Sequence, residues 1–123
     1  ILIGVLPPRD ILYDRCDRRF ENMLETGAVA EVKDLRHKVN SGDVAQDALI
    51  TKAIGYPEIC AWLDGVMSPE DAVISAQKAT RHYAKRQMTW LRNQLTCDMT
   101  YDPTTMKPSD ILDLLRQTSN FDI

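Results

Sequence analysis

Paired cysteines and long apolar runs are both missing from this sequence, and each absence excludes a class of protein. The three cysteines among its 123 residues lie far apart and form no C-x-x-C pair. This spacing argues against a zinc site or a disulfide framework and favours reduced thiols, as in a cytoplasmic protein. No apolar run approaches the roughly 20 residues that a membrane-spanning helix needs, so we expect no membrane partner.

Acidic residues are missing from residues 72–97, although the chain as a whole is acidic. The net charge is −3, from 15 basic and 18 acidic residues. The acid-free stretch holds five of the basic residues, which leaves 10 basic against all 18 acidic residues elsewhere, a balance of −8. A basic segment inside an acidic protein is typical of a polyanion-binding surface.

The apolar spacing predicts a mostly α-helical chain with one or two short strands. A buried strand is expected at residues 1–6 and a short one at residues 99–101. A first helix is expected to run from Asp10 as its cap to Gly27 as its stop, followed by a second over residues 28–39.

Three further helices are expected in the second half of the chain. A short one opens at residues 55–58 and ends at Gly65, and a long one covers about residues 68–95, with Pro69 at its first position. Ser109 is expected to cap the last helix. The apolar side of this last helix comprises Ile111, Leu112, Leu114 and Leu115.

The long helix is expected to carry its basic side chains on one face. These side chains follow one another at steps of three, four and seven residues, and no acidic residue is interleaved. Like charges at such spacings repel by roughly 0.2–0.5 kcal/mol per pair, so an external phosphate backbone explains the face better than solvation alone. The basic face consists of Lys78, Arg81, Lys85 and Arg92, and the apolar stripe expected to point inward consists of Ala72, Ala76, Ala79, Tyr83 and Trp90.

The first helix also carries arginines, at positions 15, 18 and 19. Acidic residues are interspersed among them, so spacing alone favours ion pairing within this helix. The acidic residues concerned are Asp14, Asp17 and Glu21.

Residues 79–92, A-T-R-H-Y-A-K-R-Q-M-T-W-L-R, resemble the signature of the tRNA dimethylallyltransferases (tRNA isopentenyltransferases), A-T-R-x-x-A-K-R-Q-x-T-W, at every fixed position. R-C-D-R-R-F at residues 15–20 and A-I-G-Y-P-E at residues 53–58 resemble two further elements of that family, in the same order and spacing. The resemblance extends to about Tyr101, and nothing is carried onto the tail after Pro103.

The resemblance implies a P-loop-type α/β core in a longer parent enzyme, with residues 1–123 forming the C-terminal part of its catalytic domain. The motif G-x-x-x-x-G-K-[ST] does not occur in this sequence, which begins with Ile1 rather than Met. We therefore expect the P-loop, the catalytic aspartate beside it and the family's helical insertion to lie outside this chain. No catalytic residue is assigned here, and the chain alone is expected to be inactive.

The implied reaction moves a dimethylallyl group from dimethylallyl diphosphate to N6 of the adenosine 3′ of the anticodon. The implied partners are the tRNA anticodon stem-loop and the prenyl diphosphate, and the implied cofactor is Mg²⁺. The enzyme is expected to be a monomer. The adenine would be flipped out of its stack to expose N6.

The same resemblance implies roles for individual residues. Arg19 matches the arginine that binds the diphosphate, which replaces the ion-pairing interpretation of its helix. Tyr56 and Trp90 have aromatic rings suited to stacking on bases, but for Trp90 we expect a place in the core. The tRNA-binding set, from the motif matches and the basic face together, is Lys52, Ala53, Ile54, Gly55, Tyr56, Pro57, Lys78, Arg81, Lys85, Arg86, Gln87, Thr89 and Arg92.

Two other functions stay open. An adenylate isopentenyltransferase, which prenylates free nucleotides, shares the core but has no need of a long phosphate-binding face. A non-catalytic helical RNA-binding module would need this chain to be complete in itself.

Overall fold

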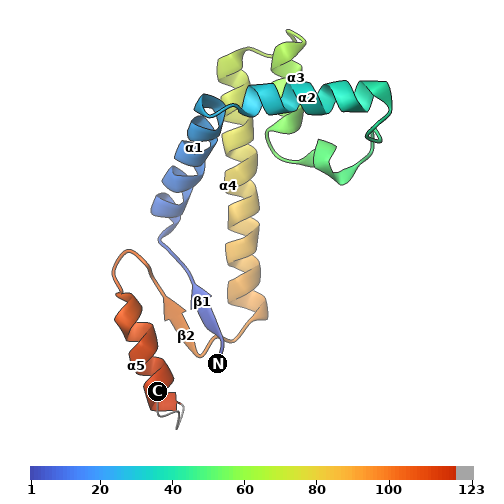
Figure 1. The fold of residues 1–123 in the computed structure, drawn as a ribbon. Helices are drawn as coiled ribbons and strands as arrows, with labels where there is room; N and C mark the ends of the chain where they lie inside the picture. Colours follow the sequence, from blue (N-terminus) through green and yellow to red (C-terminus); the bar gives the residue numbers. More distant parts are fainter. Residues whose placement is uncertain (119–123) are drawn as a thin grey trace. The chain divides into compact units, whose positions relative to one another are not determined.

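The computed structural model describes residues 1–118, apart from the side chains of Leu114 and Thr118. Helices make up most of it, with one two-stranded parallel sheet (Figure 1). The elements are, in order, β1 (Ile3–Val5), α1 (Arg9–Glu25), α2 (Ala28–Ser41), a 3-10 turn η1 (Leu49–Lys52), α3 (Tyr56–Leu63), α4 (Pro69–Gln94), β2 (Met99–Tyr101) and α5 (Pro108–Thr118).

The chain divides into two compact units. The sheet unit comprises Ile1–Leu12 and Lys85–Ile123, and the helical unit comprises Tyr13–Ala84. Both boundaries fall inside helices, α1 and α4, so no loop or linker in the sequence marks them.

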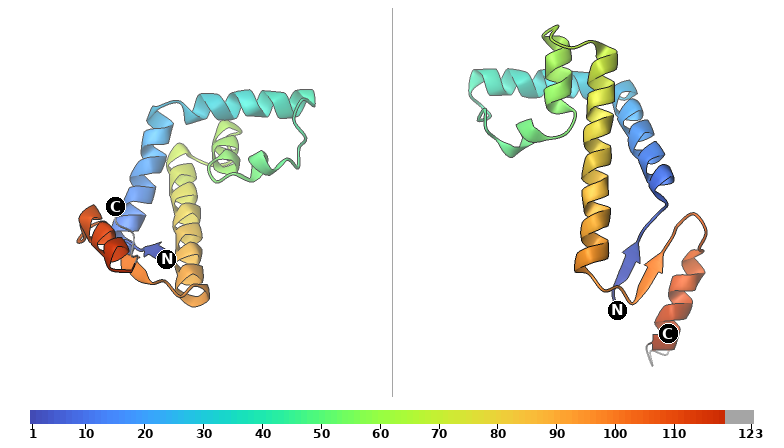
Figure 2. Two further views of the ribbon diagram at one scale, coloured as in Figure 1. Left: turned by 60° about the horizontal axis from the view of Figure 1, so that its bottom comes forward. Right: turned by 180° about the vertical axis from the view of Figure 1, so that it is seen from behind.

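In the sheet unit, β1 and β2 run parallel, with Ile3 paired to Met99 and Val5 to Tyr101 (Figures 1 and 2). This confirms the two predicted strands. Gly4 of β1 is buried against the end of α4 and the segment after it, where a Cβ would lie 3.3 Å from Cδ2 of Leu91 and 2.8 Å from Sγ of Cys97. Glycine therefore lets the strand approach the segment after α4 at a distance that a side chain would prevent.

Helix α5 begins one residue before Ser109, at Pro108, so the prediction of Ser109 as its cap is wrong. The backbone N–H of Lys107 donates to Oδ2 of Asp110 at 2.8 Å, which places the cap at Lys107. Proline fits the first helical position because its fixed φ suits the helix and its missing N–H costs nothing there. Leu112, one of the four apolar residues named for this helix, is 53% exposed. The side chain of Leu114, which belongs to the same predicted apolar side, is not among those that the structure describes.

In the helical unit, α1, α2, α3 and the first part of α4 surround a small apolar core. Helices α2 and α3 are in contact, and hydrogen bonds join α1 to α4. The buried apolar side chains here are Phe20, Val32, Ile59, Ala72, Ala76 and Ala84.

Local sequence signals set most of the helix ends. Ser68 caps α4, because its Oγ accepts the Asp71 N–H at 3.0 Å, as predicted. Gly55 precedes α3, and its N–H donates to the Glu58 carboxylate at 2.8 Å. Asp10 is not a cap: α1 already begins at Arg9, so Asp10 lies in the first turn, where its charge still favours the helix dipole.

The inward stripe predicted for α4 is only partly correct. Ala76 is fully buried, but Tyr83 is 50% and Trp90 59% exposed. The buried positions follow steps of four, from Ala72 through Ala76 and Ala84 to Met88. At about 100° per residue this line turns by about 160° around the helix over 16 residues, so α4 buries different sides in its two halves.

No helix in the described part of the chain is long and apolar enough to cross a membrane.

Candidate nucleic-acid interface

The basic residues of α4 are exposed, with one exception. In the helical unit Lys78 is exposed, and in the sheet unit Lys85 and Arg92 are exposed. None of these three forms a salt bridge with another residue of the described range 1–118. The remaining members of the predicted set in this region, Arg86, Gln87 and Thr89, are exposed too.

Arg81 is the exception. Its Nη1 donates to both carboxylate oxygens of Asp17 on α1, at 2.8 and 2.7 Å. Each of the two side chains is only 30% exposed. Arg81 therefore has an acidic partner that local spacing did not predict, because Asp17 lies 64 positions earlier in the chain.

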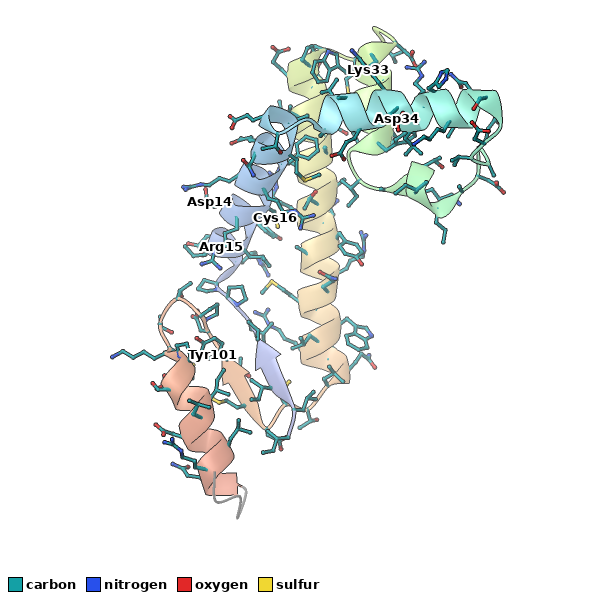
Figure 3. All side chains as sticks on the ribbon, in the orientation of Figure 1. Asp14, Arg15, Cys16, Lys33, Asp34 and Tyr101 are labelled. Carbon is teal, nitrogen blue, oxygen red and sulfur yellow. The ribbon has the colours of Figure 1, made fainter. Side chains whose placement is uncertain are left out.

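The arginines of α1 also differ in whether a carboxylate pairs with them. Arg18 pairs with Asp14 one turn earlier, at 3.0 Å, as spacing alone predicts. Arg15 and Arg19 are exposed, and no carboxylate among residues 1–118 pairs with either. Figure 3 shows Arg15 on the side of α1 turned away from α4, and Cys16 on the side towards it. Two unpaired arginines one turn apart can hold an anion between them.

The segment of residues 52–57 lies against α1 through Gly55. Gly55 is buried, with φ of +101°, and a Cβ there would lie 3.0 Å from Cε2 of Phe20. Phe20 is the neighbour of Arg19 in the chain, so this contact brings two predicted binding segments to the same part of the helical unit. Around it Lys52, Ala53, Ile54 and Pro57 are exposed.

Tyr56 is half-buried, which leaves only part of its ring for stacking. Burial, and next the nearby Cys60, raise the pKa of the Tyr56 hydroxyl, while Arg36 lowers it. Arg36 is itself held by a hydrogen bond to Asp64, which raises the pKa of its guanidinium. The ion pair between Arg36 and Asp64 ties α2 to the C-terminal end of α3.

Two features of the structure differ from what the sequence predicts or indicates. The core position expected for Trp90 is wrong, because the side chain is mostly exposed. The role of Asp17 as the partner of Arg81 also went unnoticed, since Asp17 has local arginines beside it that could equally have paired with it.

No group of three or more histidine, cysteine, aspartate or glutamate side chains within the described residues could hold a metal ion. Mg²⁺ as a cofactor stays a prediction from the family resemblance alone.

The exposed lysines and arginines are suited to polyanions, and comparison with known proteins identifies the class. The family model "IPP transferase" matches residues 1–94, and the chain belongs to this family.

Similar proteins carry a more specific name. The chain is 48% identical over 97 residues to the tRNA dimethylallyltransferase of Anaplasma phagocytophilum, covering 79% of this chain and 30% of that protein. It is 45% identical over 115 residues to that of Novosphingobium aromaticivorans, covering 91% and 39%. The chain thus spans about a third of the length of these relatives.

Two solved structures share the fold. The tRNA isopentenylpyrophosphate transferase of Bacillus halodurans matches with a TM-score of 0.78 and 32% identity, over 96% of this chain and 37% of that one. The corresponding protein of Staphylococcus epidermidis matches with a TM-score of 0.75 and 33% identity, over 95% and 36%.

Proposed function

We propose that this chain is the C-terminal part of the catalytic domain of a tRNA dimethylallyltransferase. The observation that carries the proposal is the complete A-T-R-x-x-A-K-R-Q-x-T-W signature on a single helix whose basic side chains are exposed, apart from Arg81. Full-length relatives of this name match the chain at 45–48% identity.

In the proposed reaction, N6 of the flipped adenine attacks C1 of dimethylallyl diphosphate. The bond between C1 and the bridging oxygen breaks, diphosphate leaves with the electron pair, and a base outside this chain takes the N6 proton. Arg19 would hold the leaving diphosphate by charge-assisted hydrogen bonds, and Arg15 lies one turn away on the same side of α1. Mg²⁺ would neutralise further diphosphate charge, with ligands from outside this chain.

In the helical unit the tRNA would contact Lys78 and the 52–57 segment, and in the sheet unit it would contact Lys85 and Arg92. Such phosphate contacts position an RNA without reading its sequence. A P-loop-type core would be supplied by the part of the enzyme beyond this chain. We infer a soluble, cytoplasmic, monomeric enzyme, in keeping with its RNA substrate.

The competing function is prenylation of a free adenine nucleotide. Filter binding of this chain to tRNA and to AMP separates the two: the tRNA enzyme predicts salt-sensitive binding of tRNA and negligible binding of AMP. Preference for AMP would favour the nucleotide enzyme. Prenyl transfer to tRNA is then measured with an enzyme of the family's full length that contains this sequence, while this chain alone is expected to show none. Tight tRNA binding without transfer by the full-length enzyme would instead indicate a binding module.

A further inference from the structure

Two side chains of α4 form hydrogen bonds with one turn of α1 within the helical unit. Arg81 contacts both carboxylate oxygens of Asp17 at 2.7–2.8 Å. One turn earlier on α4, Nε2 of Gln77 donates to Oε1 of Glu21 at 3.1 Å and to the carbonyl oxygen of Asp17 at 3.4 Å. Because Asp17 and Glu21 are also one turn apart, the two helices are joined at two successive levels and run antiparallel.

This pairing fixes both the height and the rotation of α1. A single contact would let the helix turn about it, but two contacts one turn apart hold one side of α1 against α4. The buried ring of Phe20 lies on the neighbouring side, against Gly55. Slipping by one residue would rotate α1 by about 100° and break all of these contacts together.

The consequence concerns the opposite side of α1. Arg19 follows Asp17 by two residues, which places it roughly 200° around the helix from the Arg81 contact. Arg15 lies on the same outer side, and neither has a carboxylate partner among the described residues. The attachment of Asp17 to α4 therefore determines where the free guanidinium of Arg19 is presented.

We propose that Arg81 is a positioning residue for the diphosphate arginine rather than a ligand of tRNA phosphate. It acts through Asp17, with Gln77 and Glu21 as the second level of the same attachment. The proposal rests on the proposed role of Arg19. It also separates Arg81 from the rest of its basic face: Lys78, Lys85 and Arg92 are available to RNA, whereas the Arg81 charge is already neutralised.

The test compares Arg81→Gln, Asp17→Asn and the double variant in the full-length enzyme, with Lys85→Gln as matched control. We expect each single variant to lower kcat/KM for the prenyl donor by between about 10- and 100-fold, since a misplacement of about 1 Å costs up to 100-fold. The double variant should lose no more than either single one, because the two residues act as a pair. The salt slope of tRNA binding should stay unchanged in Arg81→Gln and fall by roughly 0.7–0.9 in Lys85→Gln.

The opposite pattern overturns the proposal. An RNA ligand at position 81 predicts a lower salt slope in Arg81→Gln and no donor defect in Asp17→Asn. If the neutral variants do not fold, Arg81→Lys and Asp17→Glu keep the charges while altering the geometry, and the same donor defect is expected.

A further readout does not depend on the enzyme activity. In this chain alone, the nuclear Overhauser effect between the Phe20 ring and the Gly55 α-protons should weaken in Arg81→Gln. If the contact between Phe20 and Gly55 and the kcat/KM for the prenyl donor are both unchanged, the positioning role of Arg81 is wrong. If the contact weakens in Arg81→Gln but the full-length enzyme transfers no prenyl group, the role of Arg81 in holding α1 is supported. Only the proposed function is then contradicted.

Discussion

The ring of Phe20 lies against the backbone of Gly55, so that a Cβ at position 55 would approach its Cε2 atom to 3.0 Å. This contact joins α1 to the segment before α3. Arg19, the predicted diphosphate ligand, precedes Phe20, and Tyr56 follows Gly55. One glycine and one aromatic ring thus link the two segments to which the prenyl donor and the tRNA are assigned.

Gly55→Ala is expected to destabilise the protein more than Gly42→Ala. Both glycines have positive φ, +101° and +86°, which costs an alanine on the order of 1–2 kcal/mol. Only at Gly55 does the new methyl group also meet a neighbour, because nothing lies within 4 Å at Gly42. Overpacking against Phe20 should add about 1 kcal/mol or more. Urea denaturation of the two variants measures the difference, and equal losses would refute the contact.

Arg19→Ala in the full-length enzyme is expected to impair use of the prenyl donor. Losing a charged hydrogen bond to the leaving diphosphate should cost about 2–4 kcal/mol in the transition state, measured as kcat/KM for dimethylallyl diphosphate. Arg18→Ala is the matched control, because Arg18 is already paired with Asp14. Weaker tRNA binding with unchanged donor kinetics would show that the role assigned to Arg19 is wrong.

Neutralising Lys85 and Arg92 together, each to glutamine, should weaken tRNA binding and flatten its salt dependence. Removing one lysine or arginine that binds a phosphate lowers the slope by roughly 0.7–0.9, because fewer counterions are released. Both side chains are exposed, so the melting temperature should hardly change. Lys33→Gln with Lys107→Gln removes the same charge elsewhere and should leave the slope nearly intact. If both double variants bind alike, α4 is a solvated surface and not an RNA-binding one.

Thr104→Ala is expected to raise the pKa of Asp102. The Thr104 hydroxyl and then its backbone N–H donate to the Asp102 carboxylate, at 2.6 and 2.8 Å, and lower its pKa. A lowered folded pKa stabilises the protein above the unfolded value of about 4, and this contribution is lost as the pH falls through the folded value.

Carbon-13 NMR titration of the Asp102 carboxyl group in this chain measures the shift directly. Thr105→Ala is the control, since the Thr105 hydroxyl contributes least to the lowering. Identical titrations of wild type and Thr104→Ala would exclude the hydroxyl as the cause.

The sequence by itself determined the features that depend on near neighbours in the chain. The Ser68 cap and the glycine before α3 were predictable, because each depends on residues a few positions apart. The strand at Met99–Tyr101 was predicted from its own residues, although its partner β1 lies at the other end of the chain. The motif that indicates the family is likewise continuous, so it could be read without a structure. Even the wrong cap at Ser109 lies only two residues after the actual cap at Lys107.

Only the tertiary structure decided which sides of the helices are buried and which charges are paired. A regular stripe on α4 placed Trp90 inside, but the buried side turns along the helix as its neighbours change, and Trp90 is exposed. Arg81 and Lys85 both belong to the basic face of α4 and have no acidic neighbour within that helix. Arg81 nevertheless pairs with Asp17 of α1, whereas Lys85 does not. Spacing along one helix fixes the direction of a side chain relative to that helix alone. What the side chain meets depends on a second helix, which long-range packing puts in place.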